Sequence, residues 1–321
     1  MLWFIVTIGV LGTVGIRIAQ RRVMDRIAPP ATKDPVGGIP VPRDYVADPL
    51  VEPAERNNGP ATIVSLAPSL TETCCALGLL DRLAGRTQYC INPPAIGRVP
   101  VIGALVDANL EQILSIRPEM ILISKNAGRV GERLTELKLS FEALTDDSLG
   151  GVFAAIERIG ELTDRRRTAA HLIGNLHHDL AAISMAARTR RPQRVLIVEG
   201  DLPVPPRAIF VAGPGLFLSE LLTRLGHVNA AEAVVHARSG ELSLEQIVTL
   251  NPDVILEVLP TAGPRTPEAA GDLYRTWRQI GAIRAIENRA VRSYGTPADL
   301  VCSPRINIVY YQLAKAMAEW R

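Results

Sequence analysis

Two glutamates stand at matching places in two helical segments of this chain. Glu72 lies six residues before Gly78, and Glu220 lies six residues before Gly226. Each segment has the pattern of a helix that ends at a glycine just past its last turn, so each carboxylate falls in the first turn. A carboxylate there stabilises the helix dipole, or it binds a cationic group of a partner. The residues alone leave both interpretations open.

The cysteines and histidines lack the spacing of a metal site. None of the four cysteines forms a C-x-x-C pair, and Cys74 and Cys75 fall inside a helical pattern that suits buried thiols. Three of the five histidines share one helical stretch, namely His171, His177 and His178. We therefore predict no catalytic residues and no metal site in this chain.

One glycine-rich loop keeps an enzyme among the alternatives. Gly213-Pro214-Gly215 stands between an expected strand and an expected helix, as in a nucleotide-binding loop. However, Leu218 occupies the place of the last glycine of G-x-G-x-x-G, and no G-x-S-x-G or G-x-x-x-x-G-K-[ST] motif occurs. A nucleotide-dependent α/β enzyme is the less favoured alternative.

The elements that position these residues are organised around a repeat. Residues 110–123 and 244–257 share Leu-Glu-Gln-Ile, then a proline at a fixed offset, an acid and an apolar run. Leu-Glu-Gln-Ile suits a short helix that the proline ends. The apolar run suits a strand buried on both faces of a parallel sheet. The repeat therefore predicts two lobes built on one plan.

Length and composition agree with two lobes. The chain has 321 residues, is 47% hydrophobic and carries a net charge of +2, which gives no charge bias toward nucleic acid. Residues 149–190, between the two copies of the repeat, keep helical spacing with one expected interruption at 164–167. This stretch predicts a stiff connector helix and hence little opening and closing of the lobes.

The N-terminal part is expected to lie outside the folded body. Residues 1–20 begin with an apolar stretch that lacks charged side chains, which predicts a membrane anchor, or an uncleaved signal. The arginines that follow favour a cytoplasmic body under the positive-inside rule, so the orientation stays open. Residues 21–61 are rich in proline and predict an extended linker, with an arm strapped onto the body as the alternative.

Four motifs, in order along the chain, resemble the helical-backbone periplasmic binding proteins for cobalamin and ferric siderophores. They lie in residues 63–72, 85–94, 109–118 and 303–306. The resemblance implies an α/β fold of two similar lobes with mainly parallel sheets, a single long helix that joins them and a ligand cleft between them. The lobes would span residues 62–148 and 191–321, on either side of a connector at 149–190.

The resemblance also implies a function. Such a protein is the substrate-binding protein of an ABC importer, held by its N-terminal segment on the periplasmic side of the inner membrane. It needs no intrinsic cofactor, its ligand is cobalamin or a related metal chelate such as a ferric siderophore or haem, and its partner is the ABC transporter permease. A membrane-tethered scaffold or sensor that kept the fold without import is the alternative.

Docking residues follow from the same resemblance. In this family one surface glutamate of each lobe meets arginines of the permease. Glu72 matches the first, and Glu220 lies about one helical turn from the second position, which Thr223 occupies here.

The ligand-binding residues are also inferred from the resemblance. Tyr89, Leu105 and Ser124 fall at cleft positions that are aromatic in cobalamin binders, so much of an aromatic platform for a corrin is absent here. Asp299 could accept a hydrogen bond from a corrin amide or stand near a metal chelate. Cys90 and Cys302 fall in loops aimed at the same cleft, and a soft-metal site, a disulfide across the lobes and plain thiols all stay open.

Overall fold

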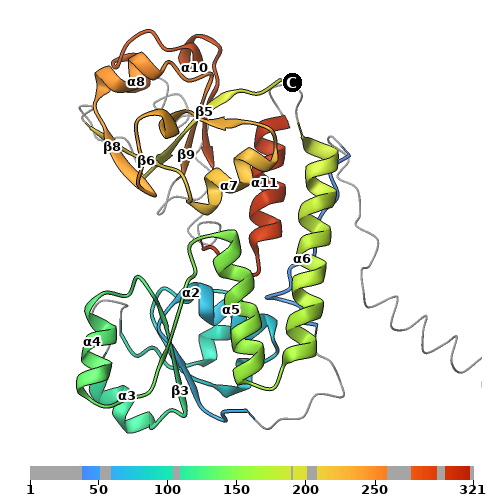
Figure 1. Cartoon of the computed structure of the whole chain (residues 1–321), viewed down its shortest axis with the longest axis vertical. Helices are drawn as coiled ribbons and strands as arrows, with labels where there is room; N and C mark the ends of the chain where they lie inside the picture. Colours follow the sequence, from blue (N-terminus) through green and yellow to red (C-terminus); the bar gives the residue numbers. More distant parts are fainter. Residues whose placement is uncertain are drawn as a thin grey trace, which may run out of the picture.

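The protein folds into two α/β lobes beside one long helix (Figure 1). The computed structural model describes residues 38–50, 59–103, 109–188, 191–200, 208–258, 276–294 and 301–318. The two-lobed α/β architecture with mainly parallel sheets, predicted from the sequence, is confirmed.

The first lobe is built on a fully parallel four-stranded sheet with the order β2-β1-β3-β4. Both central strands are buried along their whole length, as expected for a parallel sheet covered by helices on both faces. The strands are β1 (Ile63–Ser65), β2 (Leu83–Arg86), β3 (Met120–Ser124) and β4 (Glu142–Leu144), and the helices are α2 (Pro68–Ala76), α3 (Leu110–Ile116) and α4 (Arg129–Glu136).

The second lobe has a six-stranded mixed sheet. Strands β10, β9 and β5 are parallel neighbours, β7 adds a short parallel pair beside β5, and β6 and β8 extend the sheet antiparallel. The strands are β5 (Arg194–Glu199), β6 (Ile209–Ala212), β7 (Val228–Asn229), β8 (Ser239–Leu242), β9 (Val254–Val258) and β10 (Val291–Tyr294), and the helices are α7 (Phe217–Arg224), α8 (Leu244–Leu250), α10 (Arg284–Glu287) and α11 (Ile306–Ala318).

The two copies of the repeat have the same local structure. The predicted helix is α3 in one copy and α8 in the other, and each begins at a side-chain cap, Asn109 or Ser243, that accepts a hydrogen bond from a backbone N–H in the first turn. Each ends at a left-handed residue before the proline, Arg117 with φ 51° and Asn251 with φ 44°. Because the residue before proline avoids the α region, the helix stops there and the chain enters the buried strand.

The connector differs from the prediction of one helix over 149–190. It consists of two helices, α5 (Leu149–Leu162) and α6 (Arg166–Ala187), which pack side by side (Figure 1). Asp164 takes a left-handed conformation, φ 58°, and this turn reverses the chain at the interruption that the sequence suggested. Only α6, about 33 Å long at 1.5 Å per residue, runs along both lobes.

Part of the predicted linker at 21–61 belongs to the folded body. In the segment 38–50, the side chains of Ile39, Tyr45 and Val46 are at most 3% exposed and join the main core. An extended spacer would leave such side chains in water, so the alternative of a strapped-down arm holds for this segment. The segment stays on the body because packing these three apolar side chains into the core removes their surface from water.

The predicted anchor at 1–20 lies outside the described residues, as does the rest of the chain before Gly38. Within the part that the structure describes, no helix combines the length and the apolar character that a membrane span requires.

A glycine pair tests the packing of α5 on α6. A Cβ added at Gly160 would lie 2.5 Å from the Cβ of Ala169 on α6, whereas one added at Gly174 would meet nothing within 4 Å. Gly160→Ala is therefore expected to lower the free energy of unfolding by about 1–3 kcal/mol, because the helices must separate. Gly174→Ala, the matched control, should raise it by about 0.5–1 kcal/mol. Urea denaturation measures both changes, and equal effects would contradict the close packing.

Candidate functional site

The first sheet directs its carboxyl ends toward the second lobe. The segments that follow its four parallel strands carry Ser69 at the start of α2, Tyr89, Asn126 and the pair Asp146 and Asp147. In open α/β sheets ligands bind beyond the carboxyl ends of the strands. The junction between the lobes is therefore the candidate site.

Tyr89 is the predicted ligand residue that reaches solvent. It lies in the turn after β2 and its side chain is 56% exposed, beside Ile91, which is 54% exposed. Cys90 points the other way: it is buried, and its sulfur contacts the hydroxyls of Thr71 at 3.1 Å and Thr87 at 3.2 Å. Of Tyr89 and Cys90, only Tyr89 therefore has an exposed surface on which a ligand can stack.

Ser124 is committed to a hydrogen bond inside the first lobe. Its hydroxyl donates to Asp146 Oδ1 at 2.5 Å, and the hydroxyl of Ser69 donates to the other carboxylate oxygen. Asp146 thus ties the end of β3 to the start of α2. Asp146 was not predicted from the sequence, although an acid pair shortly after a strand of a parallel sheet is a signal that could have indicated it.

An ion pair crosses from one lobe to the other. Asp147, in the loop after β4, pairs with Arg238, which precedes β8 in the second lobe. Asn126 also donates to Asp147 at 2.8 Å, and Arg238 donates to the carbonyl of Gly215 at 2.9 Å. Neither charged residue was singled out from the sequence, because they are 91 positions apart and only the fold brings them together.

Glu72 does not lie at the surface, contrary to the expectation for a docking residue. It is 2% exposed, and the hydroxyl of Ser303, which precedes α11, donates to its carboxylate at 2.5 Å. Burial raises the pKa of Glu72 from 4.5 to about 7, although the Ser303 hydrogen bond and the Arg305 charge act in the opposite direction. The residue links the first lobe to the second.

Glu220 also reaches across the junction. Its side chain is half-buried, and its carboxylate accepts a hydrogen bond from the backbone N–H of Leu149 at 3.1 Å. Leu149 is the first residue of α5, whose free N–H groups make its N-terminus a favourable place for an anion. The docking role of Glu72 and Glu220 stays a prediction, but both carboxylates already accept hydrogen bonds within the molecule.

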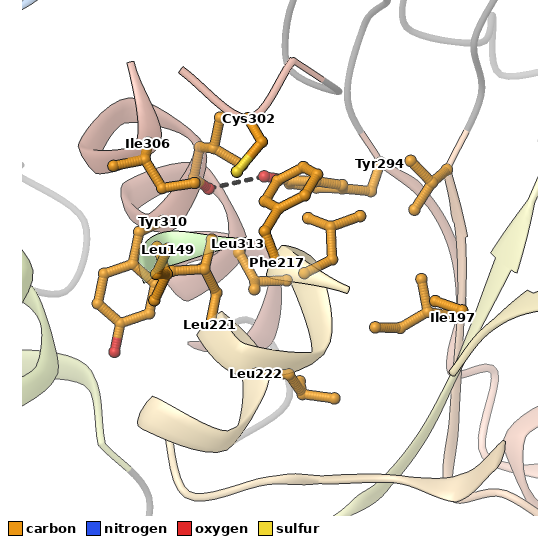
Figure 2. Close-up of a cluster of buried hydrophobic side chains, with 14 of the residues drawn as sticks. Leu149, Ile197, Phe217, Leu221, Leu222, Tyr294, Cys302, Ile306, Tyr310 and Leu313 are labelled. Atoms are coloured by element: carbon orange, nitrogen blue, oxygen red, sulfur yellow. Dashed lines mark hydrogen bonds between the residues drawn. The ribbon is translucent and has the colours of Figure 1, made fainter. Parts of the chain in front are cut away.

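Cys302 packs in the apolar core of the second lobe. Figure 2 shows its sulfur among Phe217, Tyr294 and neighbouring apolar side chains, where the Tyr294 hydroxyl donates to the Val309 carbonyl at 2.6 Å. The side chain is 5% exposed, and burial raises the pKa of its thiol well above the usual value. Cys90 and Cys302 are both free, so the suggested disulfide across the lobes is wrong.

Two predicted ligand residues, Leu105 and Asp299, lie outside the described residues. Among the residues that are described, no group of three or more His, Cys, Asp or Glu side chains is placed to hold a metal ion.

A crevice of about 550 Å³ lies between α5, α6 and α7. Glu220 lines it, together with Phe153 and His177, whose rings stack with centroids 4.3 Å apart. None of Tyr89, Cys90, Ser124 or Cys302 contributes to its wall.

The glycine-rich loop after β6 has a packing role. A Cβ on Gly213 would lie 1.9 Å from the carbonyl oxygen of Ala237, and the Gly213 N–H donates to the carbonyl of Arg238 at 2.7 Å. The loop is closed against residues 235–238, and this contact explains the glycine without a phosphate ligand. It gives the nucleotide-binding alternative no support.

This architecture is that of a two-lobed binding protein. The chain belongs to the periplasmic binding protein family, whose model matches residues 63–298. Among curated relatives, an uncharacterized ABC transporter substrate-binding lipoprotein of Bacillus subtilis, YvrC, is 27% identical over 270 residues, 80% of each chain. The vitamin B12-binding protein of Vibrio cholerae is 26% identical over 248 residues, 74% of this chain and 80% of its own.

Solved structures share the fold. The vitamin B12-binding protein BtuF of Vibrio cholerae superposes with a TM-score of 0.66 at 23% identity, over 82% of this chain and 98% of its own. The haem-binding protein BhuT, solved with two haems, gives a TM-score of 0.67 at 24% identity, over 81% and 98%. A possible iron-binding protein of Staphylococcus epidermidis gives 0.68 at 22% identity, over 81% and 99%. These likenesses bear on the fold alone.

The buried carboxyl of Glu72 predicts a pH dependence of stability. Its folded pKa, about 7, lies above the ordinary 4.5, so the folded state binds more protons between these values and stability falls as the pH rises through that window. The loss between pH 4 and pH 8 should be on the order of 3 kcal/mol. In Glu72→Gln this part of the pH dependence should vanish.

Urea denaturation at pH 4, 6 and 8 measures this effect. Glu136→Gln, a substitution at an exposed glutamate of α4, is the matched control for the loss of one carboxyl. If Glu72→Gln and the parent chain lose the same stability between pH 4 and pH 8, the buried carboxyl of Glu72 is not the group that titrates.

Proposed function

We propose that this protein is the substrate-binding component of an ABC importer and that it captures cobalamin or a related metal chelate between its lobes. The observation that carries the proposal is the junction itself. Loops from the carboxyl ends of four parallel strands meet polar groups of the second lobe there, in a chain of the periplasmic binding protein family. Relatives named for vitamin B12 and haem give the class of ligand.

The wall of the proposed ligand site is more polar than a corrin platform. Tyr89 offers an exposed ring, whereas the neighbouring loops present Asn126 and a half-buried pair of aspartates, one of which is bonded to the buried Ser124. Such a wall suits a chelate with many hydrogen-bonding groups at its edge, of which a corrin with its amides and a siderophore are examples. The protein would act by binding and delivery, without a catalytic step.

Docking to the permease is better served by the glutamates of the repeat than by Glu72 and Glu220. Glu111 and Glu245 are exposed and occupy the first turns of α3 and α8. These two helices belong to different lobes and lie on the side away from α6 (Figure 1). Each has an exposed apolar neighbour one turn later, Leu114 at 43% and Val248 at 37%. A two-lobed protein therefore presents the same small patch twice.

Two equivalent patches suit a partner with two equivalent faces. Arginines of a permease would pair with the two carboxylates, and such exposed charges guide the encounter more than they add affinity. The apolar neighbours would supply contact area that loses water on docking.

Replacing Tyr89 tests the ligand site. The probes are cyanocobalamin, haem and a ferric hydroxamate siderophore, titrated into a fragment that begins at Gly38 and so keeps the packed arm. The readout is the tryptophan fluorescence of the fragment, which contains Trp277, a buried indole bonded to Glu257 at 2.7 Å, and Trp320. The parent should bind one probe saturably, and Tyr89→Ala should weaken that binding up to about tenfold, because ring stacking contributes about 0.5–1.5 kcal/mol.

Phe210→Ala is the matched control, since Phe210 is an equally exposed aromatic residue, at 57%, on a strand of the second lobe. It should leave the affinity unchanged. Folded protein that binds none of the three probes would contradict the proposed function and favour a membrane-tethered scaffold or sensor.

The docking patches have their own test. Glu111→Lys combined with Glu245→Lys should reduce uptake of the bound probe at least tenfold in cells that contain the partner permease, because two attractive charges become repulsive. The affinity of the isolated protein for the probe should stay the same. Glu136→Lys with Glu287→Lys, at exposed glutamates of α4 and α10, is the charge-matched control. Normal uptake by the variant with both Glu111→Lys and Glu245→Lys would contradict a role of these two patches in docking.

A further inference from the structure

The N-terminal arm, residues 38–50, is bonded to two helices at once. The Tyr45 hydroxyl donates to Asp179 Oδ2 on α6 at 3.2 Å. Asn307, in the first turn of α11, donates to the same oxygen at 2.8 Å and to the carbonyl of Arg43 at 2.9 Å. One carboxylate oxygen thus joins the arm, the connector helix and the C-terminal helix.

A second set of bonds leads from the arm to the first lobe. Asp44 accepts from Arg305 Nε at 3.3 Å, and its other oxygen holds the turn that follows by accepting from the N–H groups of Val46 and Ala47. The Arg305 N–H donates to Ser303 Oγ at 3.1 Å, and that hydroxyl donates to Glu72. The arm therefore supports the loop that carries the cross-lobe bond of Glu72.

Burial of the arm and of its bonding partners favours one position of the arm against α6 and α11. Ile39, Tyr45 and Val46 pack into the core, and Asn307 is fully buried. Burial raises the pKa of Asp179, and the hydrogen bonds from Asn307 and Tyr45 act against this shift. Asp179 is partly buried, and without these donors its charge would lose much of its compensation, so displacement of the arm carries a penalty.

We propose that residues 38–48 form a strap that fixes the two lobes relative to each other. α6 runs along both lobes, and α11 packs on it from the second lobe. Separation of the lobes would require α11 or α5 to shift along α6, or α6 to bend, and the strap binds both α6 and α11. The strap also connects the N-terminal segment of the chain to this junction. The proposal does not depend on which ligand is bound, or on whether one is.

Distances between paired spin labels test the strap in the full-length chain. Glu136→Cys on α4 and Glu241→Cys on β8 supply one exposed label site in each lobe, while the four native cysteines are all buried. Asp44→Ala with Asn307→Ala removes every side-chain hydrogen bond described above for the strap except that of Tyr45 to Asp179. Relative to the labelled parent, the width of the inter-lobe distance distribution should increase at least about 1.5-fold. Amide exchange in the middle of α6 should become at least about tenfold faster.

Two further variants decide what the result means. Tyr45→Phe removes one hydroxyl and leaves the ring in the core, so it should shift both readouts in the same direction by a smaller amount. Arg284→Ala breaks the ion pair with Asp253, 2.6 Å long and wholly within the second lobe, and should change neither readout. Strap variants that stay folded by circular dichroism with an unchanged distribution would overturn the proposal. Equal broadening in Arg284→Ala would overturn it as well.

Discussion

Carboxylates that reach from one lobe into the other hold this molecule in one arrangement. Glu72 accepts from Ser303, Glu220 accepts from the start of α5, and Asp147 pairs with Arg238. Glu72 is almost wholly buried, and a buried carboxyl without a partner costs far more than a hydrogen bond returns. The lobes therefore keep the relative position in which these partners meet, and the loops of the candidate site are placed by that position.

Because the two lobes repeat the same arrangement of elements, each lobe contributes a glutamate to the contacts between them. Glu72 and Glu220 hold matching places in α2 and α7. Glu72 binds a residue of the second lobe, and Glu220 binds the start of the connector helix α5, which packs on the first lobe. The glutamates of the repeat, Glu111 and Glu245, also hold matching places but face solvent. One pair of acids thus belongs to the inside of the molecule and the other to its surface, although both pairs stand in the first turn of a helix or close to it.

The connector and the arm work on the same junction. α6 supplies a rigid edge along both lobes, and its packing on α5 depends on Gly160, which lets the helix backbones approach. The arm lies against α6 and the first turn of α11 through partly buried hydrogen bonds. In a protein whose lobes enclose a ligand, the freedom of this region sets how far the lobes can part, so a segment far from the ligand loops in sequence bears on binding.

Sequence periodicity determined much of the fold. The repeat, its prolines and the apolar runs gave two lobes, buried parallel strands and the helices α3 and α8, because each of these features depends on neighbours within about ten residues. The interruption near Asp164 was visible too, but whether the chain continued straight or reversed there depended on the packing of α5 against α6.

The site depended on the tertiary structure. A glutamate near the start of a helix looks the same in the sequence whether it faces water, as Glu111 does, or a serine 231 residues away, as Glu72 does. The same is true of Asp147 and Arg238, and of the arm, whose prolines suggested a spacer. The sequence by itself decided which residues form helices and strands, through local backbone preference and apolar period. Only the packed structure decided which charges meet, since burial and pairing are properties of distant segments brought together.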